Sequence, residues 1–246
     1  MRVAHASIDE NNHIKGGSSG NQTGKEVCIR KWYNKPWSIL IRHPNRQVRE
    51  KIAYIAETLA SPPANQLIGY DQNNRNSFHT IAKKHGYDLK DFIGAHELCE
   101  TDCSAFVTCV CLFAGINSLE YTGNAPTTSM MQTVFKTAGF EILTDQKHVG
   151  SEAYLSKGDI LVKPGSHTVI VLDDGSHFDK KPLEVYPQYK GLSDSIVEAL
   201  KEMHIISTKS FRARIYAANF EDTYTYSAVQ NMKMLSRLKG GTLIKP

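Results

Sequence analysis

The chain has 246 residues, of which 41% are hydrophobic and 22% charged, so it can bury one or two cores and does not have a disordered composition. Its longest apolar stretch, residues 109–114, is far shorter than the roughly 20 residues that span a bilayer, which argues against a membrane protein. A net charge of +4 without a concentrated basic run argues against nucleic acid as a partner. We therefore expect a soluble globular protein.

The first 45 residues combine polar, glycine-rich stretches with aromatic residues, which predicts loops around short strands. Trp32, Tyr33 and Trp37 fit core packing, with a sugar-stacking or peptide platform as the alternative. Residues 1–7 carry a charge but no apolar signal region. We expect a protein made in the cytoplasm, which another agent must release if it acts outside the cell.

Helical patterns follow. Apolar residues recur at helical spacing over 48–59 and stop at Pro62-Pro63. Further helices are predicted over 77–85, 102–115 and 128–137, and the one over 102–115 is apolar on all sides and therefore buried.

Strand patterns come next. Residues 158–165 and 167–172 are rich in β-branched residues and read as an antiparallel hairpin, which predicts an α+β fold with an antiparallel sheet. We expect a catalytic domain over 1–179, a linker over 180–190 and a small all-α domain over 191–246. That last part has three helical patterns, two of them opened by capping boxes at Ser195 and Ser227, and carries eight Lys and Arg against five Asp and Glu.

One cysteine and one histidine stand out. Cys103 opens the buried helix, where the helix dipole favours a thiolate, and His167 begins a strand able to face it. Such a pair makes a nucleophile and its base. Cys109 and Cys111 read as core residues and Cys28 as inert, while Cys99 is a conceivable redox partner. With no paired metal-ligand spacing, we expect no metal and no cofactor.

The segment Asp102-Cys103-Ser104-Ala105-Phe106, with Gly158-Asp159-Ile160 ahead of His167, resembles the NlpC/P60-type peptidoglycan peptidases and their CHAP relatives. Residues 68–75 and 21–27 resemble wall hydrolases encoded by phages and prophages of Gram-positive bacteria. The resemblance covers roughly residues 1–178 and implies a papain-like fold. The pattern of residues 191–246 resembles short wall-anchoring modules.

The resemblance also implies further site residues. The third catalytic residue is expected on the strand after the histidine, where Asp179 or Glu184 is the candidate, with Gln22 or Glu26 of the early loop as an alternative source. The expected substrate-binding residues are Tyr70, Gln72, Asp102, Ser104, Gln22 and Glu26.

The resemblance implies hydrolysis of an amide in the peptidoglycan stem peptide through Cys103 and His167, with peptidoglycan and its associated wall polymers as partners. Endopeptidase cleavage follows from NlpC/P60, and N-acetylmuramoyl-L-alanine amidase activity is the CHAP alternative. Two other classes remain: a non-catalytic wall-binding or phage structural protein, and a cytosolic cysteine acyltransferase or protease.

Overall fold

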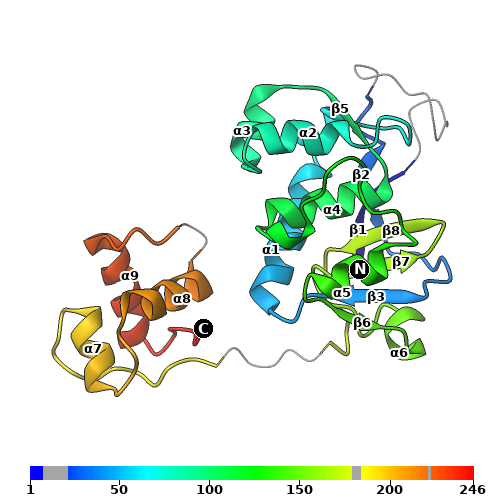
Figure 1. Cartoon of the computed structure of the whole chain (residues 1–246). Helices are drawn as coiled ribbons and strands as arrows, with labels where there is room; N and C mark the ends of the chain where they lie inside the picture. Colours follow the sequence, from blue (N-terminus) through cyan, green and yellow to red (C-terminus); the bar gives the residue numbers. More distant parts are fainter. Residues whose placement is uncertain (8–21, 179–183, 221–222) are drawn as a thin grey trace. The chain divides into compact units, whose positions relative to one another are not determined.

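The computed structural model describes residues 1–7, 22–178, 184–220 and 223–246. The chain forms two compact units, Met1–Phe178 and Asp179–Pro246 (Figure 1). Among the described residues, no helix combines the length and apolar character needed to cross a membrane.

The first unit is built on a six-stranded antiparallel sheet. The predicted hairpin is confirmed, because β7 and β8 pair with Lys163 opposite His167. On its other side β8 pairs with β1, a strand from the start of the chain. In spatial order the strands are β2 (Val27–Lys31), β1 (Arg2–Ala6), β8 (His167–Val171), β7 (Ile160–Lys163), β3 (Ile39–Arg42) and β6 (Glu141–Leu143).

Both faces of this sheet are buried. Ile160, Val162 and Ile170 point into the main core with the helices, while Val169 and Val171 point into a second core on the opposite face. Alternation along a strand sends neighbouring residues to opposite faces. Two-sided burial therefore explains why these strands are apolar runs instead of alternating polar and apolar residues.

Helices α1 (Arg46–Leu59) and α4 (Cys103–Phe113) pack on the main core (Figure 1). Every residue of α4 is buried, as its sequence predicts. The Asp102 side chain caps α4 by accepting a hydrogen bond from the Ala105 amide at 2.8 Å, and the helix ends before Gly115, whose φ is +91°.

The other elements surround this framework. Helices α2 (Ser77–Lys84) and α5 (Met131–Thr137) match the predicted segments, whereas α3 (Leu89–Ala95) and α6 (Gln146–Val149) were not predicted. Two three-residue strands, β4 (Ile68–Tyr70) and β5 (Cys99–Thr101), form a separate parallel pair. That pair sets Tyr70 opposite Thr101, immediately before the cap of α4.

The second unit contains the three predicted helices, α7 (Ile196–Glu202), α8 (Lys209–Asn219) and α9 (Ala228–Lys239), around a core of its own. One capping detail differs from expectation, because the Ser195 side chain makes no cap bond; the Thr208 side chain caps α8. The expected linker is also shorter, because Tyr186 and Tyr189 are buried in the core of the second unit. Residues 184–190 thus belong to that unit.

Candidate active site

Cys103 lies at the junction of α4 with the sheet. The backbone amides of Ser104 and Thr168 lie close enough to its thiol to lower the pKa of that group, and Thr168 is the residue after His167. The side chain of Cys103 is almost buried, with 5% of its surface exposed. The structure therefore brings the first residue of α4 close to Thr168, the second residue of β8.

Burial raises the pKa of the Cys103 thiol to about 12, and the Asp102 carboxylate adds to the rise. The Thr168 amide, Arg75 and the Ser104 amide act in the opposite direction. This result corrects the expectation of a dipole-stabilised thiolate. Removing a charge from water costs more here than the partial positive charge of a helix terminus returns, so the resting thiol is protonated.

His167 is held on two sides. Its Nε2 atom lies 3.3 Å from Nδ1 of His5, and the Trp37 ring stacks on the imidazole with centroids 6.2 Å apart. Burial lowers the pKa of His167 to about 4, assisted by the positive charges of Lys35 and Arg30. The imidazole is thus neutral at pH 7 and able to accept a proton.

His5 is the residue that sequence reasoning missed. It lies on β1 opposite Cys28, is only 2% exposed, and places Nε2 3.5 Å from the Cys28 sulfur. The Tyr33 hydroxyl lies 3.5 Å from Nδ1. Burial lowers the pKa of His5 to about 3, and the charges of His167, Arg30 and Lys35 contribute. The signal in the sequence is a histidine inside an otherwise apolar N-terminal strand.

Asp179 and Glu184 were the expected third catalytic residues. Asp179 falls outside the described residues. Glu184 belongs to the second unit, where its carboxylate lies 3.4 Å from Nζ of Lys245 and its carbonyl accepts the Lys245 amide. Among the described residues, the hydrogen-bond partner found for His167 Nε2 is His5.

Gln22 and Glu26, from the segment before β2, are hydrogen-bonded to other parts of the first unit or to their own segment. The Gln22 side-chain amide donates to the carbonyls of Leu67 and Cys99 at 3.2 and 3.3 Å, which ties it to β4 and β5. The buried Glu26 carboxylate accepts the Thr23 hydroxyl at 2.8 Å and the Lys25 amide at 2.9 Å. These bonds give Gln22 and Glu26 a structural explanation that needs no substrate.

Arg75 fixes the start of α4. Its Nη2 donates to the Asp102 carboxylate at 3.0 Å and to the Ser104 hydroxyl at 2.7 Å, and its Nη1 donates to the Ala125 carbonyl at 2.8 Å. All of these side chains are buried. Asp102 and Ser104, expected to contact substrate, are therefore already engaged in holding Cys103 in place.

The hydrogen bonds from Arg75 to Asp102, Ser104 and Ala125 form a clamp, and Tyr70 lies near it. The Gln72 amide donates to the Tyr70 hydroxyl at 3.4 Å. The pKa of Tyr70 is raised, chiefly by burial and then by the charge that Cys103 would carry, which places the phenol near the thiol. Tyr70 and Gln72 thus remain candidates for substrate contact.

The other cysteines separate into two kinds. Cys99, Cys109 and Cys111 are fully buried and their pKa values are raised by burial, which suits core residues. Cys28 is half-buried and contacts His5, so it lies nearer the site than the sequence suggested. All five cysteines are free, and the described residues contain no cluster of three or more His, Cys, Asp or Glu side chains suited to a metal.

Comparison with known proteins gives one family. The endolysin-like domain matches residues 3–178, a span that includes His5, Cys103 and His167 and ends at the boundary of the first unit. Neither the search of curated proteins nor the search of solved structures finds a match. Since the matched span covers most of the chain, the protein belongs to the endolysin-like domain family, which implies a hydrolase with a cell-wall lytic role.

Proposed function

We propose that the first unit is a cysteine peptidase that hydrolyses an amide bond of the peptidoglycan stem peptide. Cys103 is the nucleophile, His167 is the general base and acid, and His5 is a positioning residue that orients His167. The observation that carries the proposal is the chain of contacts from the Cys103 thiol to the Thr168 amide beside His167, and from His167 Nε2 to His5.

One set of tautomers makes this chain reactive. If His5 carries its proton on Nε2, facing the Cys28 sulfur, its Nδ1 accepts a hydrogen bond from Nε2–H of His167. The His167 proton is then fixed on Nε2, and Nδ1 keeps a free lone pair. A neutral imidazole of this kind acts as a base toward a neutral thiol.

The reaction follows from these protonation states. His167 Nδ1 takes the thiol proton as the Cys103 sulfur attacks the amide carbonyl, and backbone amides at the start of α4 stabilise the negative oxygen. The imidazolium then protonates the leaving nitrogen, the C–N bond breaks, and a thioester remains. Water, deprotonated by His167, attacks the thioester and releases the carboxylate, while the proton returns to the Cys103 sulfur.

The scissile bond is proposed from the resemblance in the sequence. Cleavage after a D-glutamyl residue is the first choice, following the NlpC/P60 resemblance, and cleavage between muramic acid and L-alanine is the CHAP-type alternative. A purely wall-binding or structural role would leave the contact between Cys103, Thr168, His167 and His5 without a use.

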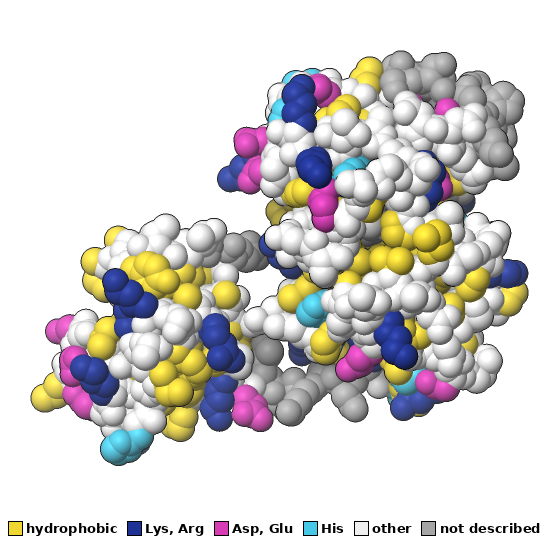
Figure 2. Space-filling model, viewed as in Figure 1, with side chains coloured by type: hydrophobic (Ala, Val, Ile, Leu, Met, Phe, Trp, Pro, Cys, Tyr) yellow, Lys and Arg dark blue, Asp and Glu magenta, His cyan; other side chains and the backbone are white. Residues whose placement is uncertain are grey.

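For the second unit we propose wall binding. Its visible face carries Lys and Arg side chains among hydrophobic ones (Figure 2). Arg237 lies 4.7 Å from the centre of the Phe220 ring, and Lys209 lies 5.7 Å from that of Tyr226. Cations beside aromatic rings suit an anionic wall polymer whose sugars stack on the rings.

The proposal is tested with purified walls and two matched variants. Cys103→Ser replaces the thiol by a hydroxyl of similar size that is a far poorer nucleophile, so it should abolish the fall in turbidity. Cys109→Ser makes the same chemical change six residues further along α4, where the thiol is buried in the core, and should retain lysis. Lysis by a folded Cys103→Ser protein would remove Cys103 from the mechanism.

A further inference from the structure

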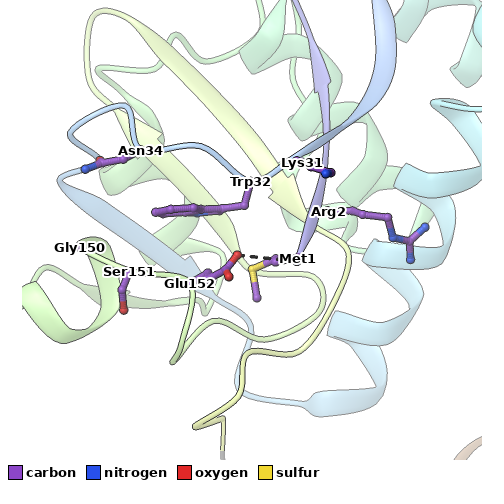
Figure 3. Close-up of a pocket in the computed structure, with 8 residues that line it drawn as sticks. All are labelled: Met1, Arg2, Lys31, Trp32, Asn34, Gly150, Ser151 and Glu152. Atoms are coloured by element: carbon purple, nitrogen blue, oxygen red, sulfur yellow. Dashed lines mark ion pairs between the residues drawn. The ribbon is translucent and has the colours of Figure 1, made fainter.

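A cavity of about 690 Å³ lies outside the proposed catalytic residues (Figure 3). It opens beside the end of β2 and is closed on another side by the segment that follows α6. The residues that matter for its chemistry are Met1, Lys31, Trp32, Asn34, Ser151 and Glu152.

Trp32 supplies the apolar wall of this cavity. In Figure 3 its ring is seen edge-on, with Ser151 and Glu152 on one side of the ring plane. Its indole Nε1 is buried and has no hydrogen-bond partner among the described residues, whereas Nε1 of Trp37 donates to the Tyr33 carbonyl at 3.0 Å. A buried indole N–H normally finds a partner, so the packing of Trp32 against the second core leaves this donor unused.

Polar groups surround the ring. Lys31 and Asn34 offer N–H donors, and Asn34, Ser151 and Glu152 offer oxygen acceptors. Glu152 is half exposed and lies 3.7 Å from the amino group of Met1, so its carboxylate is partly neutralised. Arg2 also lines the cavity, and its guanidinium is paired with Glu57 and Asp173. An aromatic ring with mixed donors and acceptors, and with these charges paired, suits a neutral saccharide better than a strongly charged ligand.

The cavity is joined to the catalytic residues by one short stretch of chain. Tyr33, which follows Trp32, places its hydroxyl 3.5 Å from His5, and Trp37 stacks on His167. A ligand seated on Trp32 would therefore lie next to the segment that supports the catalytic pair. In peptidoglycan the stem peptide is attached to the sugar chain, so a sugar held here would deliver its peptide toward that pair.

We propose that the Trp32 cavity binds an N-acetylated amino sugar of the glycan strand. The biological role of this site rests on the proposed function. The sugar would belong to the same peptidoglycan molecule whose stem-peptide amide the first unit is proposed to cleave. The sugar ring would stack on the indole, and its hydroxyl and acetamido groups would bond to Asn34, Ser151 and Lys31.

The test uses the full chain labelled with ¹⁵N and chitotetraose, a peptide-free oligomer of N-acetylglucosamine. The protein has two tryptophans, so its NMR spectrum has two indole N–H signals, which the Trp32→Phe variant assigns. Chitotetraose should shift the Trp32 signal in a saturable way and leave the Trp37 signal nearly unmoved. Trp32→Ala should weaken binding by about tenfold or more, the loss of one aromatic stack.

Tyr54→Ala is the matched control, because Tyr54 is 63% exposed on α1 and does not line the cavity. It should bind chitotetraose like the wild type. If Trp32→Ala does not fold, Asn34→Ala and Ser151→Ala, which change only the rim of the cavity, should also weaken chitotetraose binding. The inference would be overturned if the Trp32 indole signal does not shift when chitotetraose is added, or if it shifts only with a free stem peptide.

The two proposals fail separately. If wall lysis depends on Cys103 but the Trp32 signal does not shift, the proposed peptidase activity is supported and the proposed sugar site is refuted. If the Trp32 signal shifts but the protein releases nothing from walls, the proposed sugar site is supported and the proposed peptidase activity is refuted.

Discussion

Replacing His5 by Asn should make the first unit less sensitive to acid. The folded protein keeps His5 and His167 uncharged, with pKa values lowered to about 3 and about 4, whereas an unfolded histidine titrates near 6.5. Between these values the unfolded chain binds protons that the folded chain does not. Stability is therefore highest above pH 6.5 and falls as the pH drops toward 4.

The size of this effect can be worked out. For one histidine whose pKa falls from 6.5 to 4 or below, lowering the pH from 7 to 5 reduces the free energy of unfolding by about 2 kcal/mol. His5→Asn removes one such group and retains a side-chain acceptor near the position of Nδ1. Its loss of stability between pH 7 and 5 should be smaller than that of the wild type by about 2 kcal/mol.

Urea unfolding followed by tryptophan fluorescence measures this difference. Both tryptophans lie in the first unit, so the signal reports that unit alone. His96→Asn is the matched control, since His96 is exposed in the first unit and its φ of +54° suits asparagine, and it should leave the acid sensitivity of the wild type unchanged. Equal acid sensitivity in the wild type and His5→Asn would show that His5 titrates normally in the folded protein and would refute the reasoning.

Three further predictions concern other parts of the molecule. Arg75→Met leaves the buried Asp102 carboxylate without its ion pair and should lower the free energy of unfolding by about 3 kcal/mol in a urea titration, whereas a stability equal to the wild type would contradict the clamp. Initial lysis rates measured on walls should hold from pH 7 to about pH 5 and fall near pH 4, where His167 takes up a proton; a half-loss already at pH 6.5 would mean an unperturbed base. A fragment of residues 184–246, shown to be folded by circular dichroism, should sediment with purified walls; a folded fragment that stays in the supernatant with walls from every Gram-positive species tried would end the anchoring role.

The sequence could reveal elements whose signal is local. The all-apolar run after Cys103 predicts a buried helix, and the β-branched runs around Gly165 predict the β7–β8 hairpin. Periodicity also located the three helices of the second unit. In each case the pattern lies within a dozen or so consecutive residues.

The rest depends on pairing between distant segments. A strand pattern does not indicate which other strand will pair with it. Nothing in the sequence therefore predicted that His5 lies beside His167, 162 positions away. The family resemblance directed the search for a third residue to the chain after the histidine, and no local pattern indicated that β1 pairs with β8. The clamp of Arg75 on Asp102 depends in the same way on tertiary packing.

The protonation of Cys103 was also beyond the sequence. A thiol at a helix start predicts a lowered pKa, but the extent of burial decides the balance, and burial is a property of the fold. In the resting protein the proposed nucleophile and its proposed base are therefore a neutral thiol and a neutral imidazole.

The central claim is that Cys103 cleaves amide bonds in the bacterial wall. Mass spectrometry of the fragments released from purified peptidoglycan tests it most directly, because amide hydrolysis and glycosidic cleavage leave different ends. The account predicts new free amino and carboxyl groups in the stem peptide with the wild type and none with Cys103→Ser. New reducing sugar ends with intact stem peptides, produced equally by both proteins, would contradict it.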